Sequence, residues 1–226
     1  MIYVIVTAAG TGSRFGARIP KQFCILGGRP MLCHTIDNIH NALPQAKIVL
    51  TLDREACDYW ERLCHEYQFD TPPIIIGGAT RYHSVKAALE YIAGMVRDED
   101  MILVHDGARP LVRSALCRRI TDSLTVHDAV IPAIPVTDSL RAITAEGHSQ
   151  AVDRSSFRAV QTPQGFKARI ILDAYKKGFS PMFTDDASVV EAAGHKIFLC
   201  DGDSTNIKIT HPADMETAEI LLKTME

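Results

Sequence analysis

The sequence predicts an α/β fold, with a mostly parallel sheet flanked by helices, from three observations. Short apolar runs alternate with segments of helical periodicity, which is typical of repeated strand–helix–strand units. A more polar, strand-like stretch interrupts that alternation once, after Pro135. The 226 residues contain no internal repeat, low-complexity tract or linker, so we expect one domain over residues 1–226.

Apolar runs bounded by turn residues predict the strands of this sheet. We expect them at 3–8, 47–52, 73–77, 101–105, 129–132, 196–199 and 207–209. Segments with apolar residues three and four positions apart predict helices at 30–41, 55–67, 82–96, 114–125, 167–177, 185–193 and 213–224. In the helix at 82–96, Val85, Leu89, Ile92 and Val96 share one face, which predicts that this face is buried.

The polar stretch 136–160 predicts an arm that protrudes from the domain. Two strand-like segments, 140–144 and 150–153, flank the turn-forming residues 145–148. A two-stranded hairpin is at best marginally stable alone in water, so we expect the arm to pack on another surface. A second copy of the chain is the simplest candidate, which predicts a homodimer formed through this β-arm.

Composition narrows the class of protein. A net charge of -3 and a charged fraction of 23% give no general attraction to nucleic acid polymers or anionic membranes. The apolar run 2–8 is far shorter than a membrane span and lacks a basic leader. The six cysteines contain no C-x-x-C pair, which favours reduced thiols in a cytoplasmic protein.

Loops rich in glycine and cations follow the predicted strands, at the sheet edge where ligands bind in open parallel sheets. They read AAGTGSR, GGATRYHS, HDGARP and PVTDSLR, and neither a dinucleotide fingerprint nor a Walker A loop matches the first. Backbone N–H groups beside small residues favour oxygen anions, and Arg14, Lys21, Arg81 and Arg109 add positive charge. Each loop alone could be structural, but four at one edge predict a phosphate-rich ligand, a nucleotide.

The same loops resemble a known family. AAGTGSR followed by PKQ is similar to the signature of nucleotidyltransferases that couple a nucleoside triphosphate to a sugar or alditol phosphate. With VHDGARP, PVTDSLR, AVDRSSFRAVQTPQGF, TDDAS and NIKIT, the chain resembles the 2-C-methyl-D-erythritol 4-phosphate cytidylyltransferase family of the non-mevalonate isoprenoid pathway. The resemblance runs in order from residue 7 to residue 210.

This resemblance implies a Rossmann-like fold whose β-arm interlocks two subunits. It implies that CTP and 2-C-methyl-D-erythritol 4-phosphate react to give 4-diphosphocytidyl-2-C-methyl-D-erythritol and pyrophosphate, with Mg²⁺ or another divalent cation. The acceptor's own phosphate oxygen attacks the α-phosphorus, so the protein needs to position two polyanions and stabilise the charge that develops.

The resemblance also implies roles for individual residues. Catalytic roles fall on four cations, of which the first two stabilise the α-phosphate and the others hold the acceptor phosphate: Arg14, Lys21, Arg154 and Lys208. Nucleotide-binding roles fall on the loop residues Ala8, Ala9, Gly10, Thr11, Gly12, Gly78, Ser84, Asp106 and Gly107. Acceptor contacts are implied at Asp106, Arg109, Ser139, Thr162 and Thr184. Arg154 lies on the arm and could serve the partner's site.

The metal ligands are unknown from sequence. Asp106 is one candidate, whereas the adjacent Asp185 and Asp186 are explained by the dipole of a helix that starts there. Two residues depart from the family pattern where the substrates are recognised. Ala79 removes a side-chain contact to the nucleotide, and Ser139 replaces the usual threonine, which keeps the hydroxyl but loses a methyl group.

Three rival functions remain open. A cytidylyltransferase for ribitol 5-phosphate would share most motifs, although AAG at the first loop and VDRSSFRAVQTPQ in the arm favour the methylerythritol family. Hexose-phosphate uridylyl- or guanylyltransferases usually carry a second carboxylate where this chain has Lys208. A nucleotide-binding module without turnover would not need the acceptor-phosphate cations.

Overall fold

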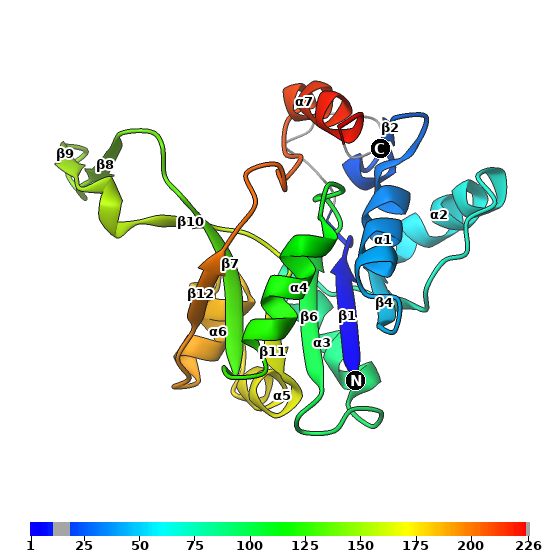
Figure 1. The fold of residues 1–226 in the computed structure, drawn as a ribbon, viewed down its shortest axis with the longest axis horizontal. Helices are drawn as coiled ribbons and strands as arrows, with labels where there is room; N and C mark the ends of the chain where they lie inside the picture. The colour runs from blue at the N-terminus through cyan, green and yellow to red at the C-terminus, as the bar shows by residue number, and fades with distance from the viewer. Residues whose placement is uncertain (11–18, 225–226) are drawn as a thin grey trace.

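The computed structural model describes residues 1–10 and 19–224, and its core is an eight-stranded mixed sheet between two layers of helices (Figure 1). The central strand β1 (Ile2–Thr7) runs parallel to its two neighbours, β4 (Lys47–Leu52) and β6 (Met101–Asp106). On the outer side of β4, β5 (Ile74–Ile76) extends the parallel half. The four predicted strands in this half are confirmed to within one residue at each end.

The other half of the sheet contains the antiparallel pairings. There β11 (Gln164–Lys167) lies between β6 and β7 (Ala129–Pro135) and runs antiparallel to both. Strand β7 also pairs with β10 (Arg158–Val160), which is antiparallel to it, and with β12 (Phe198–Asp201), which is parallel. The fold is therefore α/β with a mostly parallel mixed sheet, as predicted, although β10 and β11 were not predicted.

Helices on both sides of the sheet form the two layers. One face of the sheet is covered by α1 (Met31–Ala42), α2 (Arg54–Glu66) and α4 (Ser114–Ser123), and the other by α3 (Arg81–Ile92), α5 (Ala168–Lys176) and α6 (Asp186–Ala192). Successive side chains of a strand point to opposite faces, so Val4 and Val6 pack in the first layer while Tyr3 and Ile5 pack in the second. Burial on both faces explains why β1 is a continuous apolar run.

Several predicted elements differ in the structure. Strand β7 continues to Pro135 rather than ending at residue 132, and β12 begins and ends two residues later than the predicted 196–199. The strand at 207–209 is wrong, because these residues form no sheet ladder and Ile209 instead donates its backbone N–H to the Ala108 carbonyl at 2.9 Å. Ile209 is buried in a small cluster beneath α7 (Pro212–Leu222), which explains its apolar character. Helix α3 ends at Ile92 rather than at residue 96, just before the helix-breaking Gly94.

The predicted arm projects away from the sheet (Figure 1). Its strands β8 (Leu140–Ile143) and β9 (Ser149–Val152) form a separate antiparallel hairpin in which Leu140 faces Val152. A short 3₁₀ turn, η3 (Arg154–Ser156), leads back toward β10. The apolar side chains of Ile143 and Phe157 are exposed on this segment, at 70% and 45%.

Among the described residues, no helix has the length and apolar character that a membrane span requires.

Candidate active site

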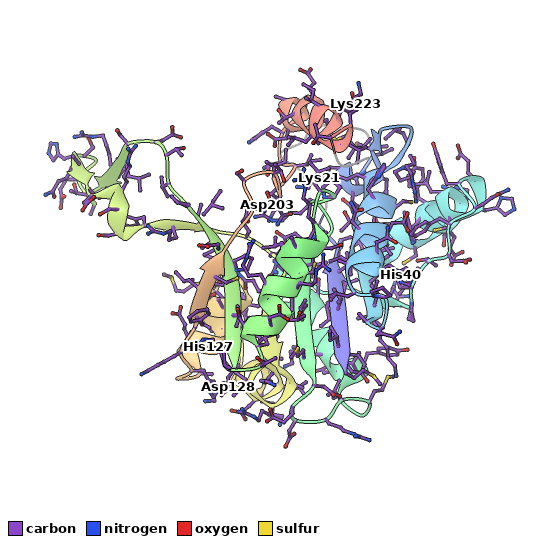
Figure 2. All side chains as sticks on the ribbon, in the orientation of Figure 1. Lys21, His40, His127, Asp128, Asp203 and Lys223 are labelled. Carbon is purple, nitrogen blue, oxygen red and sulfur yellow. The ribbon has the colours of Figure 1, made fainter. Side chains whose placement is uncertain are left out.

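A cleft of about 460 Å³ opens at the carboxyl ends of β1, β5 and β6. Its lining combines backbone-rich segments with charged side chains, namely Thr7, Ala8, Ala9, Gly10, Lys21, Gln22, Asp53, Gly78, Ala79, Thr80, Arg81, Ser84, Asp106, Ala108, Lys208 and Thr210. Lys21 lies beyond the tips of β1 and β6 (Figure 2). The sheet edge predicted from the loop sequences is thus the edge that carries the cleft.

The loop after β1 is held from below by Gln22, which the sequence interpretation did not single out. Gln22 is only 4% exposed, and its Nε2 donates to the carbonyls of Ala8 at 2.8 Å and Gly10 at 3.3 Å. Ala8 also donates its N–H to the Thr51 carbonyl at 3.0 Å. These bonds fix the first three residues of the loop, 8–10, at the cleft.

Lys21 belongs to the short turn η2 (Lys21–Phe23), which Pro20 precedes. Its Nζ donates to the Ile209 carbonyl at 2.8 Å and so connects the first loop to the segment that carries Lys208. Proline fixes its own backbone angle, and Pro20 has a φ of -55° here. The ammonium group therefore enters the cleft from a constrained turn.

The loop between β5 and α3 approaches the first loop closely. A Cβ at Gly77 would lie 2.3 Å from the Ala9 Cβ, so a larger residue could not occupy this position without moving one of the loops. The next residue, Gly78, donates its N–H to the Ser84 Oγ at 3.1 Å. Ser84 is 3% exposed, so its hydroxyl orients the loop backbone from the first turns of α3.

Asp106 ends β6 and is surrounded by cations. Its Oδ2 lies 2.8 Å from the Lys208 Nζ and 3.6 Å from the Arg109 Nε, and its Oδ1 lies 3.4 Å from the Arg81 Nε. Burial alone would raise the pKa of this carboxyl, but the three cations hold the pKa well below its usual range. Asp106 is therefore a carboxylate at neutral pH, and it orients the cations of the cleft.

Arg81 joins Asp106 to a second carboxylate. Its Nη1 and Nη2 donate to Asp186 Oδ1 and Oδ2 at 2.9 and 2.6 Å, and the Tyr175 hydroxyl donates to Asp186 Oδ1 at 2.7 Å. Asp186 is fully buried, so the helix dipole does not by itself explain this residue. The dipole interpretation fits Asp185, the N-cap of α6, whose Oδ1 accepts the Ser188 N–H at 2.9 Å.

Two of the predicted acceptor contacts lie behind Asp106 rather than in the cleft lining. The backbone N–H of Asp106 donates to the Thr162 Oγ1 at 3.0 Å. Arg109 is 9% exposed, and its Nη1 donates to the Asn206 carbonyl at 2.7 Å. Gly107 is also structural here, since its N–H donates to the Thr7 carbonyl at 2.9 Å. These residues support the positions of Asp106 and Lys208 from beneath.

The structure brings together Ala8, Ala9, Gly10, Lys21, Gly78, Ser84, Asp106 and Lys208 in one cleft. Ser139 and Arg154 lie on the arm, where the Arg154 guanidinium donates to the Thr137 carbonyl, and Thr184 is exposed before α6. These three do not line the described cleft. Thr11, Gly12 and Arg14 lie outside the described residues.

The charges of the described cleft lining suit an anion. Lys21, Arg81 and Lys208 stand against Asp53 and Asp106, and the small residues of both loops expose backbone to the cleft. In the part of the chain that the structure describes, no cluster of three or more His, Cys, Asp or Glu side chains could hold a metal ion. The arrangement can bind and orient phosphates through lysine, arginine and backbone groups.

Comparison with known proteins identifies the family of this chain. Residues 2–224 match the model of the 2-C-methyl-D-erythritol 4-phosphate cytidylyltransferase family. A 2-C-methyl-D-erythritol 4-phosphate cytidylyltransferase from Bacteroides fragilis is 42% identical over 219 residues, which cover 96% of this chain and 98% of the relative. The chain belongs to this family.

Solved structures of family members extend the likeness to the fold. The 2-C-methyl-D-erythritol 4-phosphate cytidylyltransferase from Thermus thermophilus is 33% identical with a TM-score of 0.76, over 97% of this chain and 98% of that one. A 4-diphosphocytidyl-2C-methyl-D-erythritol synthase from Anaerococcus prevotii has a TM-score of 0.80 at 26% identity, over 99% of this chain and 98% of that one. Family membership therefore covers the cleft loops and the arm alike.

Proposed function

We propose that this chain transfers the cytidylyl group of CTP to 2-C-methyl-D-erythritol 4-phosphate. An oxygen of the acceptor phosphate forms the new bond to the α-phosphorus, the bond from that phosphorus to the bridging β-phosphate oxygen breaks, and pyrophosphate leaves with those electrons. The observation that carries the proposal is the cleft in which residues 8–10 and Gly78 face Lys21 and Lys208, in a chain of this family. No protein nucleophile takes part in this step.

The nucleotide half of the site is formed by the two small-residue loops. Backbone groups of Ala8, Ala9 and Gly10, with Gly78 oriented by Ser84, would hold the base, ribose and phosphates of CTP. Lys21 would stabilise the charge on the α-phosphoryl oxygens, together with Arg14, Thr11 and Gly12 of the loop that follows. The restraint of Lys21 by Pro20 and the Ile209 carbonyl supports this role.

The acceptor half is formed around Lys208 and Asp106. Lys208 would bind the acceptor phosphate as a compact positive charge, while Asp106 would face the alditol, with Gly107, Arg109 and Thr162 beneath it. Thr184 would approach from the loop before α6. Arg154 would supply the second positive charge that holds the acceptor phosphate.

Arg154 and Ser139 would reach a cleft of a second copy, in a homodimer formed through the arm. Both residues lie on a segment that projects away from the sheet (Figure 1). The exposure of Ile143 and Phe157 there gives apolar surface for a partner to cover. Each cleft would then be completed by the arm of the other subunit.

Mg²⁺ or another divalent cation would enter as its complex with CTP. The described residues do not fit a protein-held ion, because both oxygens of Asp106 already face cations and no cluster of three ligands accompanies it. Mg²⁺ is commonly bound through substrate phosphates and water, where it neutralises charge on the triphosphate. We also propose a cytoplasmic location, since all six cysteines are free thiols.

A pyrophosphate-release assay tests the function. CTP is offered with 2-C-methyl-D-erythritol 4-phosphate, ribitol 5-phosphate or glucose 1-phosphate in parallel, and UTP replaces CTP in a fourth reaction. We expect the methylerythritol phosphate to be preferred by about 100-fold or more in kcat/KM. A preference for ribitol 5-phosphate would assign the chain to the rival function, and no release with any pair would reject transferase activity.

A further inference from the structure

The buried carboxylate Asp186 has no role in the reaction proposed above, yet it is connected to the cleft. It is completely buried at the first residue of α6, and both of its oxygens accept from the guanidinium of Arg81. The Tyr175 hydroxyl adds a third hydrogen bond. An isolated buried charge is unfavourable by several kcal/mol, so this carboxylate depends on Arg81 for its stability, and Arg81 is held by it in return.

Helix capping does not account for Asp186. The neighbouring Asp185 is already the N-cap, with its Oδ1 on the Ser188 N–H and the Ser188 Oγ accepting the Asp185 N–H. The bonds of Asp186 instead run to side chains of α3 and α5. Asp186 therefore connects α6 to α3 and α5 through side-chain contacts rather than capping its own helix.

Arg81 transmits this geometry to the acceptor half. Two nitrogens of its guanidinium are taken by Asp186, and the remaining nitrogen, Nε, faces Asp106 Oδ1 at 3.4 Å. The other oxygen of Asp106 contacts the Lys208 Nζ at 2.8 Å. A planar guanidinium held bidentately at one edge has a defined direction at its other edge, so Asp186 sets the direction from which Arg81 meets Asp106.

We propose that Asp186 is a positioning residue that holds Arg81 against Asp106 and thereby fixes Lys208 for the acceptor phosphate. This inference rests on the proposed function for its kinetic consequence and on geometry for its structural one. Removing the negative charge of Asp186 would free the guanidinium to leave Asp106. Lys208 would then lose part of its orientation, while the nucleotide loops would stay in place.

The kinetic test compares two adjacent charge-neutral variants. Asp186→Asn removes the pair with Arg81, whereas Asp185→Asn removes the same charge one residue away and keeps an oxygen for the cap. We expect Asp186→Asn to raise the KM for the acceptor about 10-fold while changing the KM for CTP by less than about twofold. Asp185→Asn should keep both values. If the wild type is active and Asp186→Asn matches Asp185→Asn, the inference is overturned and the proposed function stands.

A second readout does not depend on turnover. The Nε–H signal of Arg81 in ¹H–¹⁵N spectra, assigned with Arg81→Lys, should exchange slowly with water in the wild type and be lost in Asp186→Asn. Persistence of the signal in that variant would overturn the inference even if the wild type had no activity. Should Asp186→Asn fail to fold, Arg81→Lys has to show the same rise in acceptor KM, and a wild-type acceptor KM in that variant would reject the role.

Discussion

The Lys208 Nζ lies 2.8 Å from Asp106 Oδ2, in an ion pair that joins the end of β6 to the segment before α7. Lys208 is the more exposed partner, at 40% of its side chain against 10% for Asp106. Asp106 also faces Arg81 and Arg109, so it stays compensated when Lys208 is removed. The lysine can therefore be replaced without leaving a buried charge alone.

Lys208→Gln should weaken binding of the acceptor and spare CTP. We expect the KM for the alditol phosphate to rise about 10- to 100-fold, because a charge-assisted contact to phosphate is lost, while the KM for CTP stays within about twofold. Initial rates with each substrate varied in turn measure this split. Lys223→Gln, at an exposed position on the end of α7 (Figure 2), is the matched control. Equal increases in both KM values would contradict the assignment.

Gln22→Leu should loosen the first loop, since the buried carbonyl of Ala8 and the partly buried carbonyl of Gly10 would lose their donor. We expect the free energy of unfolding to fall by about 1–3 kcal/mol and the KM for CTP to rise about 10-fold. Urea titration and CTP kinetics measure the two effects, with the exposed Gln45→Leu as the control. A stability loss without any change in CTP use would show that the loop does not depend on Gln22.

Continuous apolar runs made most of the parallel strands predictable from the sequence. The strands β1, β4 and β6 were predicted well because each is a continuous apolar run, and β11 was missed because Gln164 and Gly165 break any such pattern. Strand position then predicts the cleft edge, since loops after parallel strands meet there. Asp106 lies in the cleft for this reason, because it ends β6, whereas Lys208 follows no strand and reaches the cleft on the segment before α7.

Burial and long-range pairing were not predictable in the same way. Asp185 and Asp186 are adjacent and chemically identical, but one caps a helix while the other pairs with Arg81, 105 residues away in the sequence. Likewise Gln22 looks like a surface residue until its amide is seen beneath the loop of residues 8–10. Such contacts depend on how layers pack, which periodicity does not encode.

His105 predicts a loss of stability in mild acid. Its Nε2 donates to the Arg109 carbonyl at 3.0 Å, and its Nδ1 accepts a hydrogen bond from the Thr162 hydroxyl at 3.1 Å. A second proton on the ring, at Nδ1, would break the bond from Thr162. Complete burial lowers the pKa of this imidazole to about 4, despite the raising effect of the Arg109 carbonyl and of Asp106. Below about pH 6.5, unfolding therefore takes up a proton, and the free energy of unfolding decreases as the pH is lowered.

Between pH 7.5 and pH 5 we expect His105 to account for about 2 kcal/mol of that fall. Urea unfolding of the wild type and His105→Gln at both pH values measures it, because the variant should lose less stability on acidification. The pKa of His34 is also lowered by burial, so the difference between the two proteins, rather than the wild-type slope, is the diagnostic quantity. His40→Gln, on the exposed side of α1 (Figure 2), should behave as the wild type does. Parallel pH profiles for wild type and His105→Gln would refute the assignment.

The arm predicts that two inactive variants restore activity when their subunits mix. Lys21→Ala damages the cleft and Arg154→Ala damages the arm, so each homodimer should have both of its sites impaired. In a mixed dimer, the cleft of the Arg154→Ala chain receives an intact arm from the Lys21→Ala chain, and one complete site results. After subunit exchange at equal concentrations, about half of the dimers are mixed and about a quarter of the wild-type activity is expected.

The control for this mixing experiment combines both substitutions in one chain. Mixing Lys21→Ala/Arg154→Ala with the Lys21→Ala variant leaves no intact cleft in any dimer, so no activity should return. Light scattering at micromolar concentration should give the mass of two 24.9 kDa chains for each protein. A monomeric mass would contradict the proposal that the arm of a second subunit completes the site. A dimer whose mixed variants stay inactive would instead place Arg154 outside the partner's cleft, because complementation requires one subunit to complete the other.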